Sequence, residues 1–177
     1  MSYDFELYRV LGDVDPNAAY EKHVERRRQR RSSFRDSLGP VDPVKEQTKR
    51  GLVAALIAVN PELQEFRWNY EKLAKEKSID ESEARRRYRE VQLTDDFGLE
   101  ITLFDDTAAV TIPFRPNSEK VLRVAWECLR TLESEGHFST YDSQIGRVLN
   151  LAQDFDVVLK TLTNANRMVE RTLRGRR

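Results

Sequence analysis

The chain has 177 residues, enough for one domain with a sizeable core. Thirty basic and thirty acidic side chains cancel, so no whole-molecule field attracts the protein to nucleic acid or to a membrane surface. The single Cys128 excludes an internal disulfide, and no apolar run is long enough to span a bilayer. We therefore expect one domain over residues 1–177, in a reducing, cytoplasmic setting, with a basic tail at 171–177 that frays into solvent.

The first quarter of the chain predicts one strand and one exposed helix. Apolar residues alternate along 2–10, which is typical of a strand with one buried face. An Asp-Pro pair at 15–16 predicts a helix through residue 31 that offers few apolar side chains to a core. The stretch 32–42 is rich in polar residues, Gly and Pro, and predicts a flexible connection.

Three further helical segments are expected before residue 90. A second Asp-Pro pair, at 42–43, predicts a helix to Val59 that is apolar on most sides and therefore buried. Apolar residues then recur at helical spacing, at Leu63, Phe66, Tyr70 and Leu73. Asp80 and Glu83 have the spacing of a capping box and predict a short helix through residue 87.

Residues 91–114 carry the clearest signal, because three short alternating runs separated by turn residues predict an antiparallel β-meander. Their apolar positions would face a core. The opposite positions form a semi-polar face that we expect to be open to solvent or to a partner: Glu100, Thr102, Phe104 and Thr111.

After the meander, Ser118 is expected to cap a helix that ends near Glu135, and 138–141 to return as a strand. A last helix starts from about residue 151. The pattern predicts an α+β fold with an antiparallel sheet of four or five strands. Helices would cover one face of it, over 43–59, 118–135 and 151–173.

The last helix carries a heptad seam of Leu151, Phe155, Val158, Leu162, Ala165 and Val169. This seam fits two alternatives, pairing with its twin in a homodimer or packing across the sheet as core. Both stay open from the sequence.

Several segments resemble a family of uncharacterised bacterial proteins that open with Met-Ser-Tyr-Asp. The resemblance is carried by residues 1–4, 58–63, 98–103 with 110–113, and 140–144, with Ser143 standing where similar proteins more often have Pro. Some members resemble small immunity proteins that neutralise a toxin. The resemblance therefore implies a protein partner.

One polar cluster suggests chemistry: His137, Tyr141, Asp142 and Gln144. A Tyr beside an Asp could transfer a proton, and a His titrates near neutral pH, so an enzyme with a site near Tyr141 is one hypothesis. The alternative is structural. Asp142 and Gln144 would then bind turn amides, and His137 would face the negative end of its helix.

Two arginine runs suggest a nucleic-acid site as another hypothesis. The first consists of Arg26, Arg27, Arg28, Arg30, Arg31 and Arg35, and the second of Arg85, Arg86, Arg87 and Arg89. Neighbouring acidic residues dilute both runs, so solvated helix faces are the competing interpretation. Trp68 is the aromatic side chain that we expect to be exposed to a partner.

Aspartate pairs at 95–96 and 105–106 lie at predicted turns and do not have the spacing of a calcium loop. Neither His23 nor His137 has neighbours that complete a zinc site, so we expect no metal and no cofactor. The leading hypothesis is a non-enzymatic, immunity-like protein-interaction module. It would use the semi-polar sheet face and flanking arginines against an acidic partner.

Overall fold

The computed structural model describes residues 2–10, 14–29 and 39–174. Within them the helices are α1 Pro16–Gln29, α2 Pro43–Val59, α3 Tyr70–Lys77, α4 Glu81–Arg87, α5 Ser118–Gly136 and α6 Phe155–Arg174. The strands are β1 Ser2–Arg9, β2 Gln64–Phe66, β3 Val91–Thr94, β4 Glu100–Leu103, β5 Thr107–Pro113, β6 Phe138–Asp142 and β7 Arg147–Val148.

All seven strands form one sheet, in the order β2-β3-β4-β5-β1-β6-β7, and every neighbouring pair is antiparallel. The predicted α+β class and the meander β3-β4-β5 are confirmed. The predicted number of four or five strands is wrong, because β2 and β7 extend the sheet at its two edges. These edge strands have three and two residues, too few to show an alternating pattern in the sequence.

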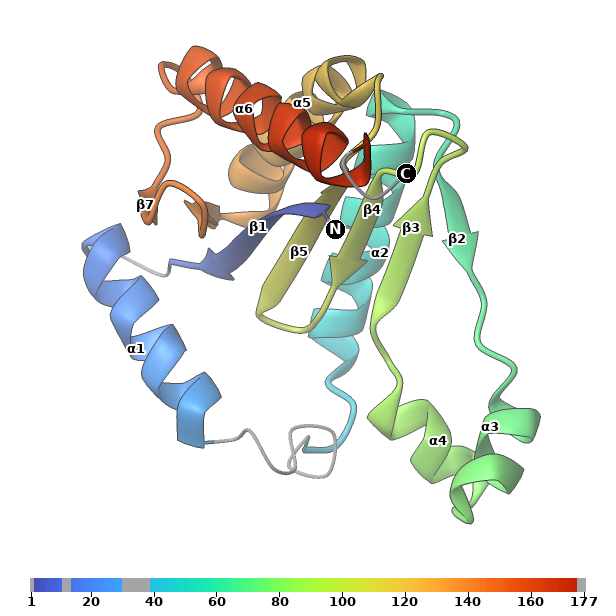
Figure 1. The fold of residues 1–177 in the computed structure, drawn as a ribbon. Coiled ribbons are helices and arrows are strands. Elements are labelled where there is room, and N and C mark those ends of the chain that lie inside the picture. The colour runs from blue at the N-terminus through green and yellow to red at the C-terminus, as the bar shows by residue number, and fades with distance from the viewer. Residues whose placement is uncertain (1, 11–13, 30–38, 175–177) are drawn as a thin grey trace.

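Helices cover one face of the sheet, as predicted. Helices α2 and α5 pack against each other, and α6 packs against α5 (Figure 1). The core lies between this layer and the sheet, where Tyr3, Phe5 and Leu7 of β1 are buried. The Trp126 ring of α5 meets the Phe155 ring of α6 edge-on, with 5.3 Å between centroids. The residues that alternate with these core positions point to the uncovered face of the sheet.

Helix α2 runs along β3, because it is bound to both ends of that strand. The Lys49 Nζ donates a hydrogen bond to the Arg89 carbonyl oxygen, just before β3, at 2.9 Å. At the other end the Asn60 side-chain amide donates to the Asp95 carboxylate at 3.0 Å. These two bonds fix the helix against the sheet from Lys49 to its C-cap Asn60.

Most predicted helix starts are confirmed by their capping bonds. The Asp42 carboxylate accepts from the Val44 N–H, and Asp80 accepts from the Glu83 N–H. The predicted cap at Ser118 is wrong. Ser118 is the first residue of α5, and its hydroxyl donates to carbonyl oxygens of the preceding turn.

The helical interpretation of Leu63, Phe66, Tyr70 and Leu73 is also wrong in its first half. Phe66 lies in β2, where it pairs with Gln92 of β3. Helix α3 begins only at Tyr70, after Asn69 accepts a hydrogen bond from the Lys72 N–H. Pairing with β3 therefore overrides the local spacing, as sheet contacts often do.

The first and last helices, α1 and α6, were both predicted from the sequence. Helix α1 is mostly exposed, as predicted, and its Tyr20 ring stacks on Tyr141 of β6 with 3.5 Å between centroids. Helix α6 begins at Phe155 rather than 151 and continues to Arg174, while residues 175–177 of the predicted tail lie outside the described residues. No helix in the described part of the chain is both long enough and apolar enough to cross a membrane.

Candidate interaction surface

A row of polar side chains crosses five strands on the face of the sheet that α2 and α5 leave open. The register places Asp4 of β1 opposite Thr111 of β5, and Thr111 opposite Glu100 of β4. It then places Glu100 opposite Thr94 of β3, and Thr94 opposite Gln64 of β2. We call these five residues the polar row. With about 4.8 Å between neighbouring strands, the row is about 19 Å long.

The polar row is accessible, and its charges are not neutralised. Gln64, Thr94 and Glu100 are exposed, and Thr111 and Asp4 are half-buried. Asp4 accepts hydrogen bonds from the Ser2 hydroxyl at 3.0 and 3.1 Å. Within the described residues neither Asp4 nor Glu100 takes part in an ion pair. The row therefore presents two carboxylates with hydroxyl and amide groups between and beside them.

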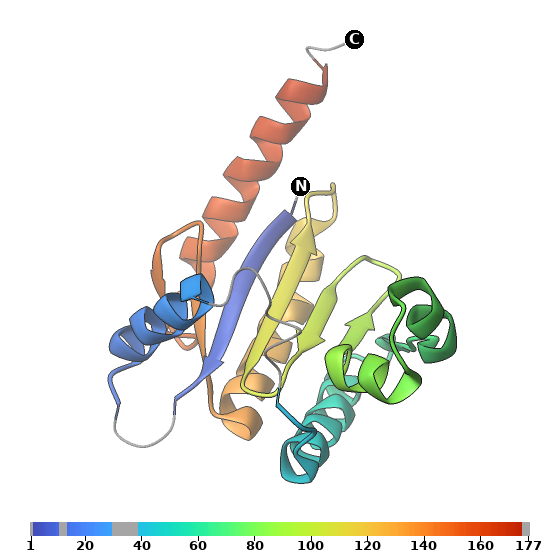
Figure 2. The ribbon, with the colours of Figure 1, turned by 90° about the horizontal axis from the view of Figure 1, so that it is seen from below.

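The described helices near this face lie at its two sides. Figure 2 looks onto the face, with α1 at one side of the strands, α3 and α4 at the other, and α5 and α6 behind. Helix α1 is bound where β1 ends, since the Tyr8 hydroxyl donates to the Pro16 carbonyl oxygen at 2.8 Å. Burial and nearby acidic groups raise the pKa of Tyr8 to about 12.

The opposite end of the sheet holds a buried charge network. The Lys49 side chain is 0% exposed and pairs with Glu46 of α2 and with Asp105 of the β4–β5 turn, the latter at 3.1 Å. Arg89 binds the same Asp105 and donates to the Gly39 carbonyl oxygen. Burial raises the pKa of Asp105, but hydrogen bonds from Arg89 and Lys49 outweigh that effect and lower it overall. Each charge in this network has a structural partner.

The polar cluster around Tyr141 does not converge on a site. Tyr141 and Asp142 are adjacent in β6 and therefore point to opposite faces of the sheet. His137 lies at the other end of β6, where it ends α5 in a left-handed conformation with φ of 54°. Gln144 is exposed in the following turn. The catalytic interpretation needs these side chains around one reacting atom, and the structure separates them.

Asp142 has the structural role that the competing interpretation predicted. One carboxylate oxygen accepts from the backbone N–H groups of Gln144 and Ile145, at 2.8 and 2.9 Å. The other accepts from the buried Tyr3 hydroxyl at 2.6 Å. Burial and the Asp142 carboxylate raise the pKa of Tyr3 well above its usual value. The hydroxyl therefore acts as a fixed donor that joins β1 to β6.

The structure describes side-chain contacts for the second arginine run but not for the first. In the second run, Arg85 pairs with Glu81, and Arg86 and Arg87 both pair with Glu83. These contacts lie within α4 and favour the solvated-face interpretation for that run. In the first run, Arg26, Arg27 and Arg28 belong to α1, but their side chains lie outside the described part of the structure. Arg30, Arg31 and Arg35 lie outside the described residues altogether.

Phe66 is exposed where Trp68 was predicted to be, and Trp68 itself is half-buried. The Trp68 indole is half-buried between the Phe66 and Tyr88 rings, with centroids 5.0 and 5.5 Å away. Phe66 is 48% exposed at the edge strand. The difference follows from β2, because strand geometry places Phe66 on the open face and the chain then turns Trp68 back toward Tyr88.

The heptad seam of the last helix is used inside the molecule for its first half. Val158 and Leu162 are buried, and Phe155 packs on Trp126 of α5. Leu151 is buried in the loop before α6 and is not part of the helix. The second half is less covered, since Ala165 and Val169 are only half-buried. A homodimer through this helix stays a prediction.

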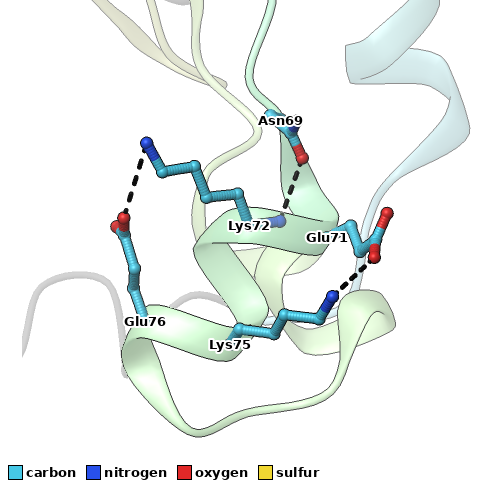
Figure 3. Close-up of a pocket in the computed structure, with 5 residues that line it drawn as sticks. All are labelled: Asn69, Glu71, Lys72, Lys75 and Glu76. Atoms are coloured by element: carbon cyan, nitrogen blue, oxygen red, sulfur yellow. Dashed lines mark hydrogen bonds and ion pairs between the residues drawn. The ribbon is translucent and has the colours of Figure 1, made fainter.

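A shallow hollow on α3 has no features of an active site. It is lined by Asn69, Glu71, Lys72, Lys75 and Glu76 (Figure 3). Its charged side chains pair along the helix, Lys75 with Glu71 at 2.7 Å and Lys72 with Glu76 at 3.8 Å. These are exposed pairs that contribute little to stability and leave no group poised for chemistry.

Residues suited to metals or nucleophilic chemistry are placed apart. No three His, Cys, Asp or Glu side chains among the described residues form a group that could hold a metal ion. Asp95 caps the β3–β4 turn by accepting from the Leu99 N–H at 2.9 Å. Cys128 is buried in α5, and burial, with nearby acidic groups, raises the pKa of its thiol to about 12. A thiol with so high a pKa is a poor nucleophile.

Comparisons with known proteins found no match, since no family model, curated protein or solved structure corresponds to this chain. The sequence predicted two members of the polar row, Glu100 and Thr111. The sequence did not predict Asp4. The alternation of β1 places Asp4 on the face of the strand away from Tyr3 and Phe5, but the position of β1 beside β5 cannot be inferred from a local pattern.

Proposed function

We propose that this chain is a non-enzymatic protein-interaction module that binds another protein through the polar row. The observation that carries the proposal is the row itself, an accessible line of polar side chains across five strands. An antiparallel sheet with one face covered leaves its other face available in this way. The dispersal of His137, Tyr141 and Asp142 supports a binding role over catalysis.

The resemblance to the Met-Ser-Tyr-Asp proteins supports the same class of function. An immunity protein that binds and neutralises a toxin is one form of such a module, and we include it in the proposal. Its partner would be a protein that contacts the polar row and leaves the helical layer of α2, α5 and α6 uncontacted.

The test is capture of a partner by tagged protein from its own cells, with and without nuclease treatment. The variant Thr94→Arg places a long charged side chain in the exposed polar row. The control, Ser134→Arg, places the same side chain on the solvent side of α5. We expect a stoichiometric protein that survives nuclease, is lost with Thr94→Arg and is kept with Ser134→Arg. Equal capture by both variants, or an empty eluate, would contradict the proposal.

Nucleic-acid binding through the arginine run of α1 stays an alternative proposal. The same eluates test it, because nucleic acid recovered only without nuclease would support that alternative. Its affinity should then fall steeply with salt, since each neutralised phosphate releases a counterion. No described contact favours it over the interaction module.

A further inference from the structure

We infer that the partner presents a cationic helix to the polar row, with two Lys or Arg side chains two helical turns apart that contact Glu100 and Asp4. This inference rests on the proposed function and names the chemistry of the partner at that same surface.

The charge of the row selects a cationic partner. Its only ionisable groups are the carboxylates of Asp4 and Glu100, and neither is in an ion pair within the described residues. A cationic group placed beside each would be attracted, and an acidic partner would be repelled. The row therefore favours a cationic partner, which differs from the sequence-based expectation of an acidic partner met by flanking arginines.

The spacing of the row favours a helix over an extended segment. Asp4 and Glu100 lie on β1 and β4, both paired to Thr111 of β5, so two strand spacings separate them by about 10 Å. On a helix, residues seven apart share one face and are separated by about 10.5 Å. On an extended strand, side chains of one face recur at about 7 Å and about 13 Å, and neither value matches. The Thr111 hydroxyl lies between the two carboxylates and can bond to a polar group on the intervening turn.

Several carboxylates on the exposed helices are already neutralised by their own neighbours. Glu71 pairs with Lys75 on α3, Glu81 with Arg85 on α4, and Glu119 with Arg123 on α5, each at a separation of four residues. A cationic partner would have to displace these bonds before it gained any. At the polar row no described cation has to be displaced, so a cationic helix would favour the row over these paired carboxylates.

The experiment uses two alanine-rich helical peptides of equal composition as probes, titrated into the isotopically labelled full chain and followed by NMR. One carries two lysines seven residues apart, on one face, and the other carries them nine residues apart, on opposite faces. We expect the first peptide to bind at least about threefold more tightly, with amide shifts centred on Glu100, Thr111 and Asp4, and to weaken as salt rises. Equal affinity of the two peptides, or shifts centred elsewhere, would overturn the inference.

Charge-removing variants complete the test. Asp4→Asn with Glu100→Gln should abolish the difference between the two peptides, whereas the control pair Glu119→Gln with Glu127→Gln, which changes the net charge equally, should preserve it. The capture assay separates this inference from the proposed function. If Thr94→Arg loses the native partner while Asp4→Asn with Glu100→Gln keeps it, the surface is supported and the cationic helix is rejected. If neither variant loses the partner, both proposals fail.

Discussion

The two ends of the sheet use charge in opposite ways. Where β3 begins and the β4–β5 turn lies, Lys49, Asp105 and Arg89 are buried or nearly so, and each binds another member of the network. At the other end, Asp4 and Glu100 lie on the open face without an ion pair in the described chain. Buried charges must be paired or hydrogen-bonded for the fold to be stable, whereas accessible charges need no partner inside the molecule. The contrast separates residues that hold the fold from residues available for binding.

The largest expected effect comes from breaking the buried network. Asp105→Ala removes one partner of the fully buried Lys49 and of Arg89, and should lower the free energy of unfolding by about 3 kcal/mol. Urea denaturation measures this loss. The neighbouring Asp106→Ala is the control, because Asp106 is exposed in its pair with Lys45 and should cost less than about 1 kcal/mol. Equal losses for the two variants would show that the network does not hold this end of the sheet.

The same network should make stability depend on pH. The lowered pKa of Asp105 means that the folded state binds a proton there less readily than the unfolded state does. Its ionised form therefore stabilises the protein at neutral pH, and this contribution is lost as the pH falls below the usual value of 3.8. The urea midpoint should decrease more between neutral pH and about pH 3 for the natural protein than for Asp105→Asn. Parallel falls would contradict the assignment.

A smaller effect is expected at the link between β1 and β6. Tyr3→Phe removes a buried hydroxyl that donates to the buried Asp142 carboxylate, and should cost about 1–2 kcal/mol of unfolding free energy. Tyr8→Phe provides the comparison, since its hydroxyl donates to a carbonyl oxygen of the mostly exposed α1 and should cost about 1 kcal/mol or less. Thermal or urea unfolding of the two variants ranks the bonds. A larger loss for Tyr8→Phe would reverse this ranking.

The smallest effect on stability is expected at the polar row. Asp4→Asn with Glu100→Gln should change the free energy of unfolding by less than about 0.5 kcal/mol, because accessible side chains without ion pairs contribute little to the fold. The measurement is again urea denaturation, beside the peptide titration. A loss above about 1 kcal/mol would give these carboxylates a structural role and remove the contrast between the two ends.

The parts of the fold that the sequence predicted are those with a long local pattern. In the meander and β1, apolar residues alternate over enough positions to identify the buried face of each strand. Asp42 and Asp80 mark the starts of their helices, because each is an N-cap residue. Strand β2 was missed because the spacing of Phe66 and Tyr70 fits a helix as well as a strand followed by one. Only pairing with β3, more than twenty residues later, decides between them.

The candidate surface was predictable only in part, for a related reason. Alternation places Glu100 and Thr111 on one face of the meander, so these residues could be found from the sequence. Joining them to Asp4 and Gln64 requires the order of strands, which depends on contacts between distant segments. The prediction of a catalytic cluster at His137, Tyr141 and Asp142 was based on residues that are close in the sequence. Neighbouring residues along a strand point to opposite faces, so closeness in the sequence did not bring these side chains together.

The place of β1 in the sheet also bears on how the chain folds during synthesis. This strand lies between β5 and β6, so its two partners begin about a hundred residues or more after it. Tyr3, Phe5 and Leu7 must therefore wait for their packing surface until most of the domain has left the ribosome. Such long-range pairing slows folding and leaves an apolar strand edge uncovered meanwhile. We expect the nascent chain to be most prone to aggregation, and most dependent on chaperones, before β5 and β6 emerge.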